Sequence, residues 1–123
     1  MTSGQAVRVL VADDDPMARE LAQLAVTGAG GIVVAALADG TDVAAWAPDV
    51  DVLLLDVHMP GPPLQDLVAA VRSANPRARL VVLTSVTQDE LDHLRRTIDV
   101  DEVVTKGDAA ALGAAVRGVS RSV

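Results

Sequence analysis

Short, nearly continuous runs of apolar residues recur along this chain, separated by longer segments in which apolar and polar residues alternate with helical spacing. The apolar runs occupy residues 7–12, 32–37, 52–55, 80–83 and 103–104. Few polar residues interrupt them, which is typical of strands that are covered on both faces, as in a parallel sheet. The pattern therefore predicts five buried strands.

The segments between these runs carry signals for the start and end of helices. In the first segment Asp15 is placed to cap a helix, Pro16 suits its first position and Gly28 is expected to end it. A shorter helix is predicted over residues 41–46, and a third begins near Leu64 and ends at Asn75-Pro76.

Two more helices follow. Thr87 and Glu90 form a capping box for the fourth, and the fifth is predicted over about residues 108–118. Strict alternation of strand and helix predicts an α/β fold, a doubly wound parallel sheet with helices on both faces. A chain of 123 residues suits one domain over residues 1–123, in which residues 120–123 could begin a linker.

Polar residues follow four of the five predicted strands at the point where each strand ends. Asp13 and Asp14 follow the first, Asp56 the third, Thr84 closes the fourth and Lys106 follows the fifth. Ligands of such sheets bind beyond the carboxyl ends of the strands. The sequence therefore predicts one acidic pocket with a hydroxyl and an amine, suited to Mg²⁺-assisted phosphoryl transfer.

A structural role competes with a functional one at each position. Asp15, beside Pro16, is interpreted as a helix cap, and an isolated Thr84 or Lys106 would be a backbone-bonded hydroxyl or a surface lysine. Asp56 favours function, because a charge that abuts a buried strand is costly unless it is paired, ligated or at the sheet rim. There it can act as a nucleophile that forms an acyl phosphate.

Composition and charge narrow the classes of function. The chain carries a net charge of -7, no Cys, no Phe or Tyr and a single Trp, Trp46. Such a domain is not expected to bind nucleic acid or anionic membranes, and it can form no disulfide or thiolate zinc site. The longest apolar run, residues 32–38, is far too short to span a membrane, and no signal peptide is evident, so a cytoplasmic location is expected.

These residues, together with Met59-Pro60-Gly61, resemble the receiver domain of bacterial two-component response regulators. The run Val-Leu-Val-Ala-Asp-Asp at 9–14 and Lys106-Gly107 are most similar to receivers of the LuxR/NarL type, whose output is a helix-turn-helix domain. The resemblance implies a flavodoxin-like (βα)5 sandwich whose parallel strands have the order 2-1-3-4-5.

The resemblance also implies a role for each site residue. Asp56 would accept a phosphoryl group from a histidine kinase, and Thr84 and Lys106 would each hold a phosphoryl oxygen. The implied cofactor is Mg²⁺, with four protein ligands: Asp14 directly, Asp13 through water, Asp56, and the backbone carbonyl of His58. The His58 imidazole has no expected catalytic role, and the domain would catalyse only its own phosphorylation and dephosphorylation.

Three positions depart from the family's pattern. Val103 replaces a common aromatic, Ser85 replaces a small Ala, and Pro62-Pro63 replaces a Gly-containing loop and is expected to stiffen it. A switch without the aromatic would use helix and loop shifts. The expected output face runs from the fourth helix through the fifth strand to the last helix, or else the first and last helices form a contact in a homodimer that phosphorylation favours.

Two other functions remain open from the residues alone. A protein-interaction domain could keep the fold without phosphorylation. A haloacid-dehalogenase-type phosphatase would use Asp13 as its nucleophile, but the chain lacks room for a cap and that mechanism would leave Asp56 and Met59-Pro60-Gly61 unused.

Overall fold

The structure is a computed structural model that describes residues 6–85 and 88–118. Its five strands are β1 (Arg8–Ala12), β2 (Ile32–Leu37), β3 (Val52–Asp56), β4 (Arg79–Thr84) and β5 (Glu102–Thr105). The helices between them are α1 (Pro16–Gly28), α2 (Val43–Trp46) with the 3₁₀ turn η1 (Ala47–Asp49), α3 (Leu64–Ala74), α4 (Gln88–Thr97) and α5 (Ala109–Arg117). Each predicted apolar run thus forms a strand.

All strand pairs are parallel, and the sheet has the order β2-β1-β3-β4-β5. The order implied by the sequence resemblance is therefore confirmed. The neighbours β1 and β3 lie where the direction of the chain across the sheet reverses, so the residues that follow them share one crevice. Lys106 is brought to this edge by β5, and its amide donates to the Thr84 carbonyl at 2.7 Å.

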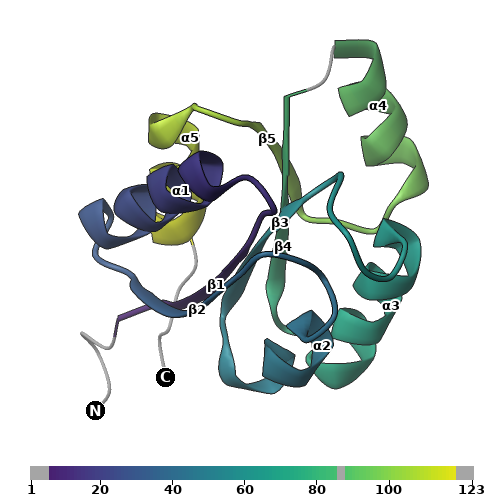
Figure 1. Cartoon of the computed structure of the whole chain (residues 1–123), viewed down its shortest axis with the longest axis horizontal. Helices are drawn as coiled ribbons and strands as arrows, with labels where there is room; N and C mark the ends of the chain where they lie inside the picture. Colours follow the sequence, from purple (N-terminus) through teal and green to yellow (C-terminus); the bar gives the residue numbers. More distant parts are fainter. Residues whose placement is uncertain (1–5, 86–87, 119–123) are drawn as a thin grey trace.

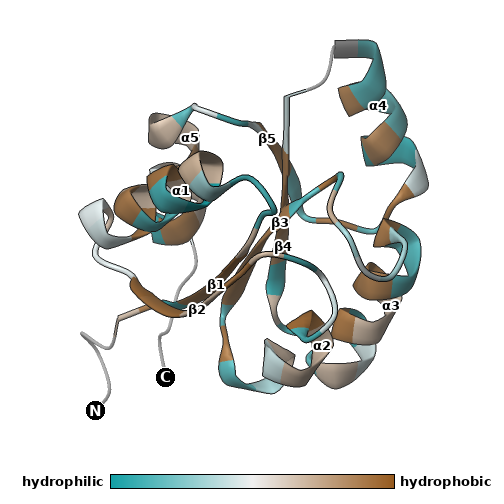
Figure 2. Ribbon diagram, viewed as in Figure 1, coloured by the Kyte–Doolittle hydropathy of each residue, from teal (hydrophilic) through white to brown (hydrophobic). Residues whose placement is uncertain are grey.

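Helices α1 and α5 cover one face of the sheet, and α2, α3 and α4 lie on the other (Figure 1). Two separate apolar cores result. One joins α1 and α5 to side chains such as Val9 and Leu54, and the other joins α2 and α3 to side chains such as Leu10 and Leu53. Successive strand residues point to opposite faces, so both cores need apolar runs without polar interruptions. Figure 2 shows this brown, apolar centre, with much of α4 in teal.

The helix ends follow the sequence signals with small differences. The Asp15 carboxylate caps α1 by accepting a hydrogen bond from the Met17 amide at 3.1 Å, as predicted. Helix α1 ends at Gly28, as predicted, and Gly30, with φ +87°, follows in the turn after it.

The other differences from the predicted helices concern where each helix begins and ends. Helix α2 begins at Val43 rather than residue 41 and continues into η1. Helix α3 ends before Asn75-Pro76 as predicted, and Asp108 caps α5 through the Ala111 amide at 3.0 Å. Thr87 of the expected capping box and the expected linker residues 120–123 lie outside the described residues.

In the described ranges, the helices are all too short or too polar to be a membrane span.

Candidate phosphoryl-transfer site

Three carboxylates gather at the carboxyl edge of the sheet. One oxygen from each of Asp13, Asp14 and Asp56 lies within 4.8 Å of the others. Asp13 is completely buried and Asp56 is 4 % exposed, whereas Asp14 is exposed to solvent. The predicted proximity of these residues is confirmed, and two of the three carboxylates are buried.

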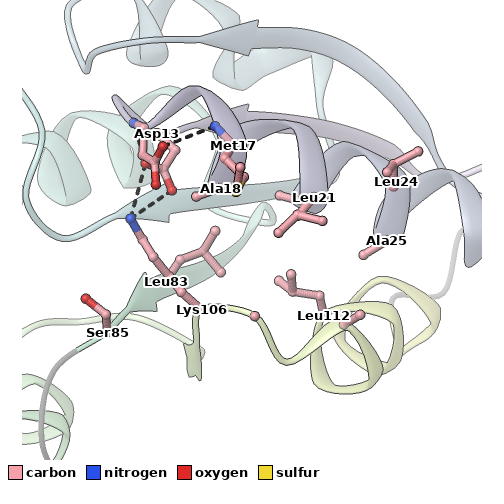
Figure 3. A pocket seen from close by; sticks show the side chains of 14 residues that line it. Asp13, Met17, Ala18, Leu21, Leu24, Ala25, Leu83, Ser85, Lys106 and Leu112 are labelled. Carbon is pink, nitrogen blue, oxygen red and sulfur yellow. Dashed lines mark hydrogen bonds and ion pairs between the residues drawn. The ribbon is translucent and has the colours of Figure 1, made fainter.

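A single ammonium group connects the two buried carboxylates. Lys106 Nζ lies 3.0 Å from Asp13 Oδ2 and 3.0 Å from Asp56 Oδ1. Figure 3 shows the lysine extending from its strand end toward Asp13 beneath the start of α1. Two buried carboxylates therefore share the charge of Lys106, with the Asp14 carboxylate close by, and the cluster favours a further cation.

The pKa values of two groups reflect this crowding. Burial raises the pKa of Asp56, and the nearby Asp13 charge adds to the effect, although the hydrogen bond from Lys106 opposes it. For Lys106 burial lowers the pKa, but hydrogen bonds to Asp13 and Asp56 outweigh burial, and the net pKa is raised. Lys106 is therefore a permanent cation at neutral pH, while ionised Asp56 is destabilised by its surroundings.

Asp13 is held in place by groups on the following turn and helix. Its Oδ1 accepts a hydrogen bond from the Asp15 amide at 3.0 Å, and its backbone carbonyl accepts one from the Arg19 guanidinium at 2.7 Å. The Asp13 amide in turn donates to the Leu37 carbonyl at 2.9 Å. The role of Arg19 was missed from the sequence, where the only signal is an arginine in the first turn of a helix that follows an aspartate loop.

The remaining predicted residues lie at the same edge. Thr84 is buried at the end of β4, next to Thr105 of β5. The His58 amide donates to Asp56 Oδ1 at 3.4 Å, and the His58 side chain is exposed. His93 lies exposed on α4, away from this group of residues.

The donor set fits Mg²⁺. All three side chains offer hard oxygen ligands, and one of the oxygens, Asp13 Oδ2, is buried without a hydrogen-bond partner of acceptable geometry although it lies near Lys106. A buried carboxylate oxygen that lacks a donor is costly unless a cation approaches it. Few protein oxygens and an exposed side leave room for water, which Mg²⁺ usually retains.

A cavity of about 580 Å³ adjoins the carboxylates on the α1 side. Its lining is mainly apolar and includes Leu21 of α1, Leu83 of β4 and Leu112 of α5, with Asp13 and Lys106 at one end (Figure 3). Among the lining residues, Met17, Leu21 and Leu24 of α1 are exposed. The acidic site thus opens beside an apolar surface rather than a charged one.

The chain belongs to the response regulator receiver domain family, whose sequence profile matches residues 9–117. The fold, the strand order and the acidic cluster described above are in agreement with this membership.

Individual relatives show the range of proteins that carry this domain. The chain is 30 % identical to the probable transcriptional regulatory protein TcrX of Mycobacterium tuberculosis over 84 % of its own length and 49 % of that protein. It is 35 % identical to a protein-glutamate methylesterase/protein-glutamine glutaminase of Myxococcus xanthus, over 90 % of its length and 33 % of that protein. The chain spans about half or less of the curated relatives it matches.

A solved structure agrees with the expected subfamily. The signal receiver domain of the putative response regulator NarL from Mycobacterium tuberculosis is 28 % identical, with a TM-score of 0.75, covering 91 % of this chain and 94 % of that one.

Proposed function

We propose that this domain is a phosphorylation-controlled signalling receiver that accepts a phosphoryl group on Asp56 from the phosphohistidine of a histidine kinase. The observation that carries the proposal is the group of three carboxylates within 4.8 Å, two of them bridged by Lys106. Membership of the receiver family supports the same reaction. The domain would catalyse only its own phosphorylation and dephosphorylation, in the cytoplasm.

The reaction requires positioning and charge stabilisation more than covalent catalysis. A carboxylate oxygen of Asp56 forms a bond to phosphorus while the P–N bond of phosphohistidine breaks, and the leaving imidazole takes up a proton from solvent. Lys106 already contacts Asp56 Oδ1 at 3.0 Å, so its ammonium is close enough to take over a phosphoryl oxygen as charge moves there. The Thr84 hydroxyl is assigned to a second phosphoryl oxygen.

Asp13, Asp14, Asp56 and the His58 backbone carbonyl would hold Mg²⁺. The bound ion would supply the positive charge that offsets the carboxylates and the phosphoryl oxygens. Direct ligation is assigned to Asp14, which is exposed, and a contact through water to Asp13, whose carboxylate is already engaged by Lys106 and the Asp15 amide.

Phosphorylation would act by binding one of two conformations better and so shifting their populations. The output is a linked domain or partner protein, and the likeness to LuxR/NarL-type receivers points to transcription. Of the two contact surfaces considered from the sequence, the exposed apolar side chains Met17, Leu21 and Leu24 favour a homodimer contact through α1 and α5. Sedimentation velocity of the phosphorylated domain tests this contact, and a monomer at all concentrations would exclude it.

Intact-mass analysis after incubation with Mg²⁺ and acetyl phosphate tests the phosphorylation itself. The wild type is expected to gain one phosphoryl group, Asp56→Asn none, and removal of Mg²⁺ by EDTA should abolish the gain. Asp66→Asn, an exposed aspartate on α3, is the matched control and should behave as the wild type.

Two outcomes would contradict the proposal. No gain of mass by the wild type would favour a phosphorylation-independent interaction domain. A phosphoryl group that peptide mapping places on Asp13, and that Asp56→Asn retains, would favour a phosphatase of the haloacid-dehalogenase type.

A further inference from the structure

Two glycines from different loops meet back to back beside the acidic site. Gly61, in the loop between β3 and α3, has φ +118°, a conformation that side chains rarely adopt. A methyl group at Gly61 would lie 3.1 Å from the Gly40 amide nitrogen and 3.2 Å from the Thr41 nitrogen. Main chain thus packs against main chain, so neither partner can give way by changing a rotamer.

A hydrogen bond joins the same two loops. The amide of Gly40, which is buried, donates to the Pro60 carbonyl at 2.9 Å. A methyl group on Gly40 would meet the side chains of Leu67 at 3.3 Å and Met59 at 3.4 Å. The turn after β2 is therefore fitted closely against the loop after β3.

The turn that presents Gly40 is itself fixed by Asp39. The Asp39 Oδ1 accepts a hydrogen bond from the Thr41 amide at 2.8 Å, forming an Asx turn around Gly40. This backbone hydrogen bond lowers the pKa of Asp39, so the carboxylate stays ionised and remains an acceptor at neutral pH. The direction in which the Gly40 amide points thus depends on a side chain outside the acidic cluster.

The loop that this turn supports begins at the phosphoacceptor. His58, whose amide donates to Asp56 Oδ1, is separated from Pro60 by a single residue. The loop also forms the wall of a cavity of about 230 Å³ that is lined by Asp56, His58 and Pro62. A displacement at Pro60 or Gly61 would therefore be transmitted over two or three residues to the His58 main chain.

We propose that Asp39, Gly40 and Gly61 are positioning residues that hold the loop after β3 in the geometry in which the His58 main chain and Asp56 bind Mg²⁺. This inference deepens the proposed function and rests on it. None of the three residues is assigned contact with the ion or the phosphoryl group. Loss of such supporting contacts around a metal site commonly weakens metal affinity by about 10-fold to 100-fold.

Variants at Asp39 test the turn. In Asp39→Ala the Mg²⁺ concentration that gives half-maximal phosphorylation by acetyl phosphate should rise by about tenfold, with little change in the maximal rate at saturating Mg²⁺. Asp39→Asn keeps an oxygen that can accept the Thr41 hydrogen bond and should restore nearly the wild-type value. A purely structural role for Asp39 would lower thermal stability without this selective change in Mg²⁺ dependence.

Variants at Gly61 test the contact between the loops. Gly61→Ala should raise the half-saturating Mg²⁺ concentration at least as much as Asp39→Ala. Gly28→Ala, at a glycine with open space around it and negative φ, is the matched control and should leave it unchanged. If Gly61→Ala does not fold, Gly40→Ala is the milder alternative, because its methyl group would meet flexible side chains.

A second measurement separates this inference from the proposed function. Mg²⁺ titrations followed by amide NMR shifts at Asp56 and His58 report ion binding without any phosphodonor. Weaker binding in Asp39→Ala and Gly61→Ala would support the inference even if the wild type took up no phosphoryl group. Folded Asp39→Ala and Gly61→Ala variants with wild-type Mg²⁺ titrations would overturn it.

Discussion

The two ends of the sheet carry the same kinds of charged residue but neutralise them differently. At the carboxyl end Asp13, Asp14 and Asp56 lie together with one ammonium group, that of Lys106. At the amino end aspartates and a glutamate stand beside arginines that introduce the strands. In the first group three carboxylates gather around one ammonium group, whereas in the second each carboxylate accepts a strand amide or pairs with an arginine.

At the amino end the carboxylates contact arginine side chains or backbone amides. Asp101 Oδ2 accepts a hydrogen bond from the Leu80 amide at 2.7 Å and forms an ion pair with Arg72 at 3.0 Å. Arg79 reaches Glu102 at 2.7 Å, and Asp51 accepts the Arg8 amide at 2.8 Å. Asp51 and Asp101 thus supply acceptors for amides near the starts of neighbouring strands, and the Arg79–Glu102 ion pair joins β4 to β5.

The difference separates structural from functional carboxylates. A carboxylate bound by an arginine and a backbone amide stabilises the fold and has little affinity left for a ligand. Carboxylates that share one lysine repel one another, and a cation relieves that repulsion. An aspartate next to a buried strand therefore does not by itself indicate a functional site. The balance of charge around it decides whether its role is structural or functional.

Removal of Lys106 should have the largest effect on stability and on phosphorylation. Lys106→Met would leave Asp13 and Asp56 buried without a cation, and we expect the free energy of unfolding at pH 7 to fall by about 3 kcal/mol. Urea denaturation measures this loss, and added Mg²⁺ should restore part of it. Phosphorylation by acetyl phosphate should also slow strongly, because a phosphoryl oxygen loses its partner.

The effect of Lys106 should depend on pH. Its pKa is raised in the fold above the ordinary 10.5, so the stability it contributes is complete below pH 10.5 and is lost as pH rises through the folded pKa. Wild type and Lys106→Met should therefore converge in stability at strongly alkaline pH. Arg95→Met, at an exposed position on α4, is the control. Equal stability of the wild type and Lys106→Met at pH 7 would contradict the role assigned to the lysine.

A change at the amino end should affect stability without affecting the site. Asp101→Ala removes the acceptor of the Leu80 amide and the partner of Arg72, and we expect a loss of about 2 kcal/mol. The Mg²⁺ dependence of phosphorylation should stay as in the wild type. Asp99→Ala is a matched control, since Asp99 is exposed and lies 3.6 Å from Arg72, and should cost less than about 0.5 kcal/mol. An altered Mg²⁺ dependence in Asp101→Ala would show that the two ends are coupled.

The smallest expected effect is a gain in stability at the carboxyl end. The raised pKa of Asp56 means that the folded state binds its proton more tightly than the unfolded state, so stability falls as pH rises from the ordinary value of 3.8 through the folded pKa. Asp56→Asn should be more stable than the wild type by about 1 kcal/mol at pH 7 in the absence of Mg²⁺. The difference should vanish below pH 3.8, and thermal unfolding across pH 3–8 measures it. A less stable Asp56→Asn at pH 7 would mean that the Lys106 ion pair outweighs burial.

Much of the site followed from local patterns. The placement of Asp13, Asp56 and Lys106 just after apolar runs was enough to predict that they meet, because parallel strands end at one edge. The degree of burial of each carboxylate could not be predicted from this placement. Asp13 and Asp14 are adjacent and chemically identical, yet one is completely buried and the other exposed, although both bring an oxygen to the same cluster with Asp56.

The sequence by itself determined the alternation of strands and helices, the α/β class and the edge at which the polar residues gather, because hydrophobic periodicity and strand ends are local properties. The tertiary structure alone decided which carboxylates pair with arginines at the amino end and how the Asp39–Gly40 turn meets Gly61. These contacts join residues that are distant in the sequence, and they depend on strand order, register and main-chain packing, for which the local pattern carries no signal.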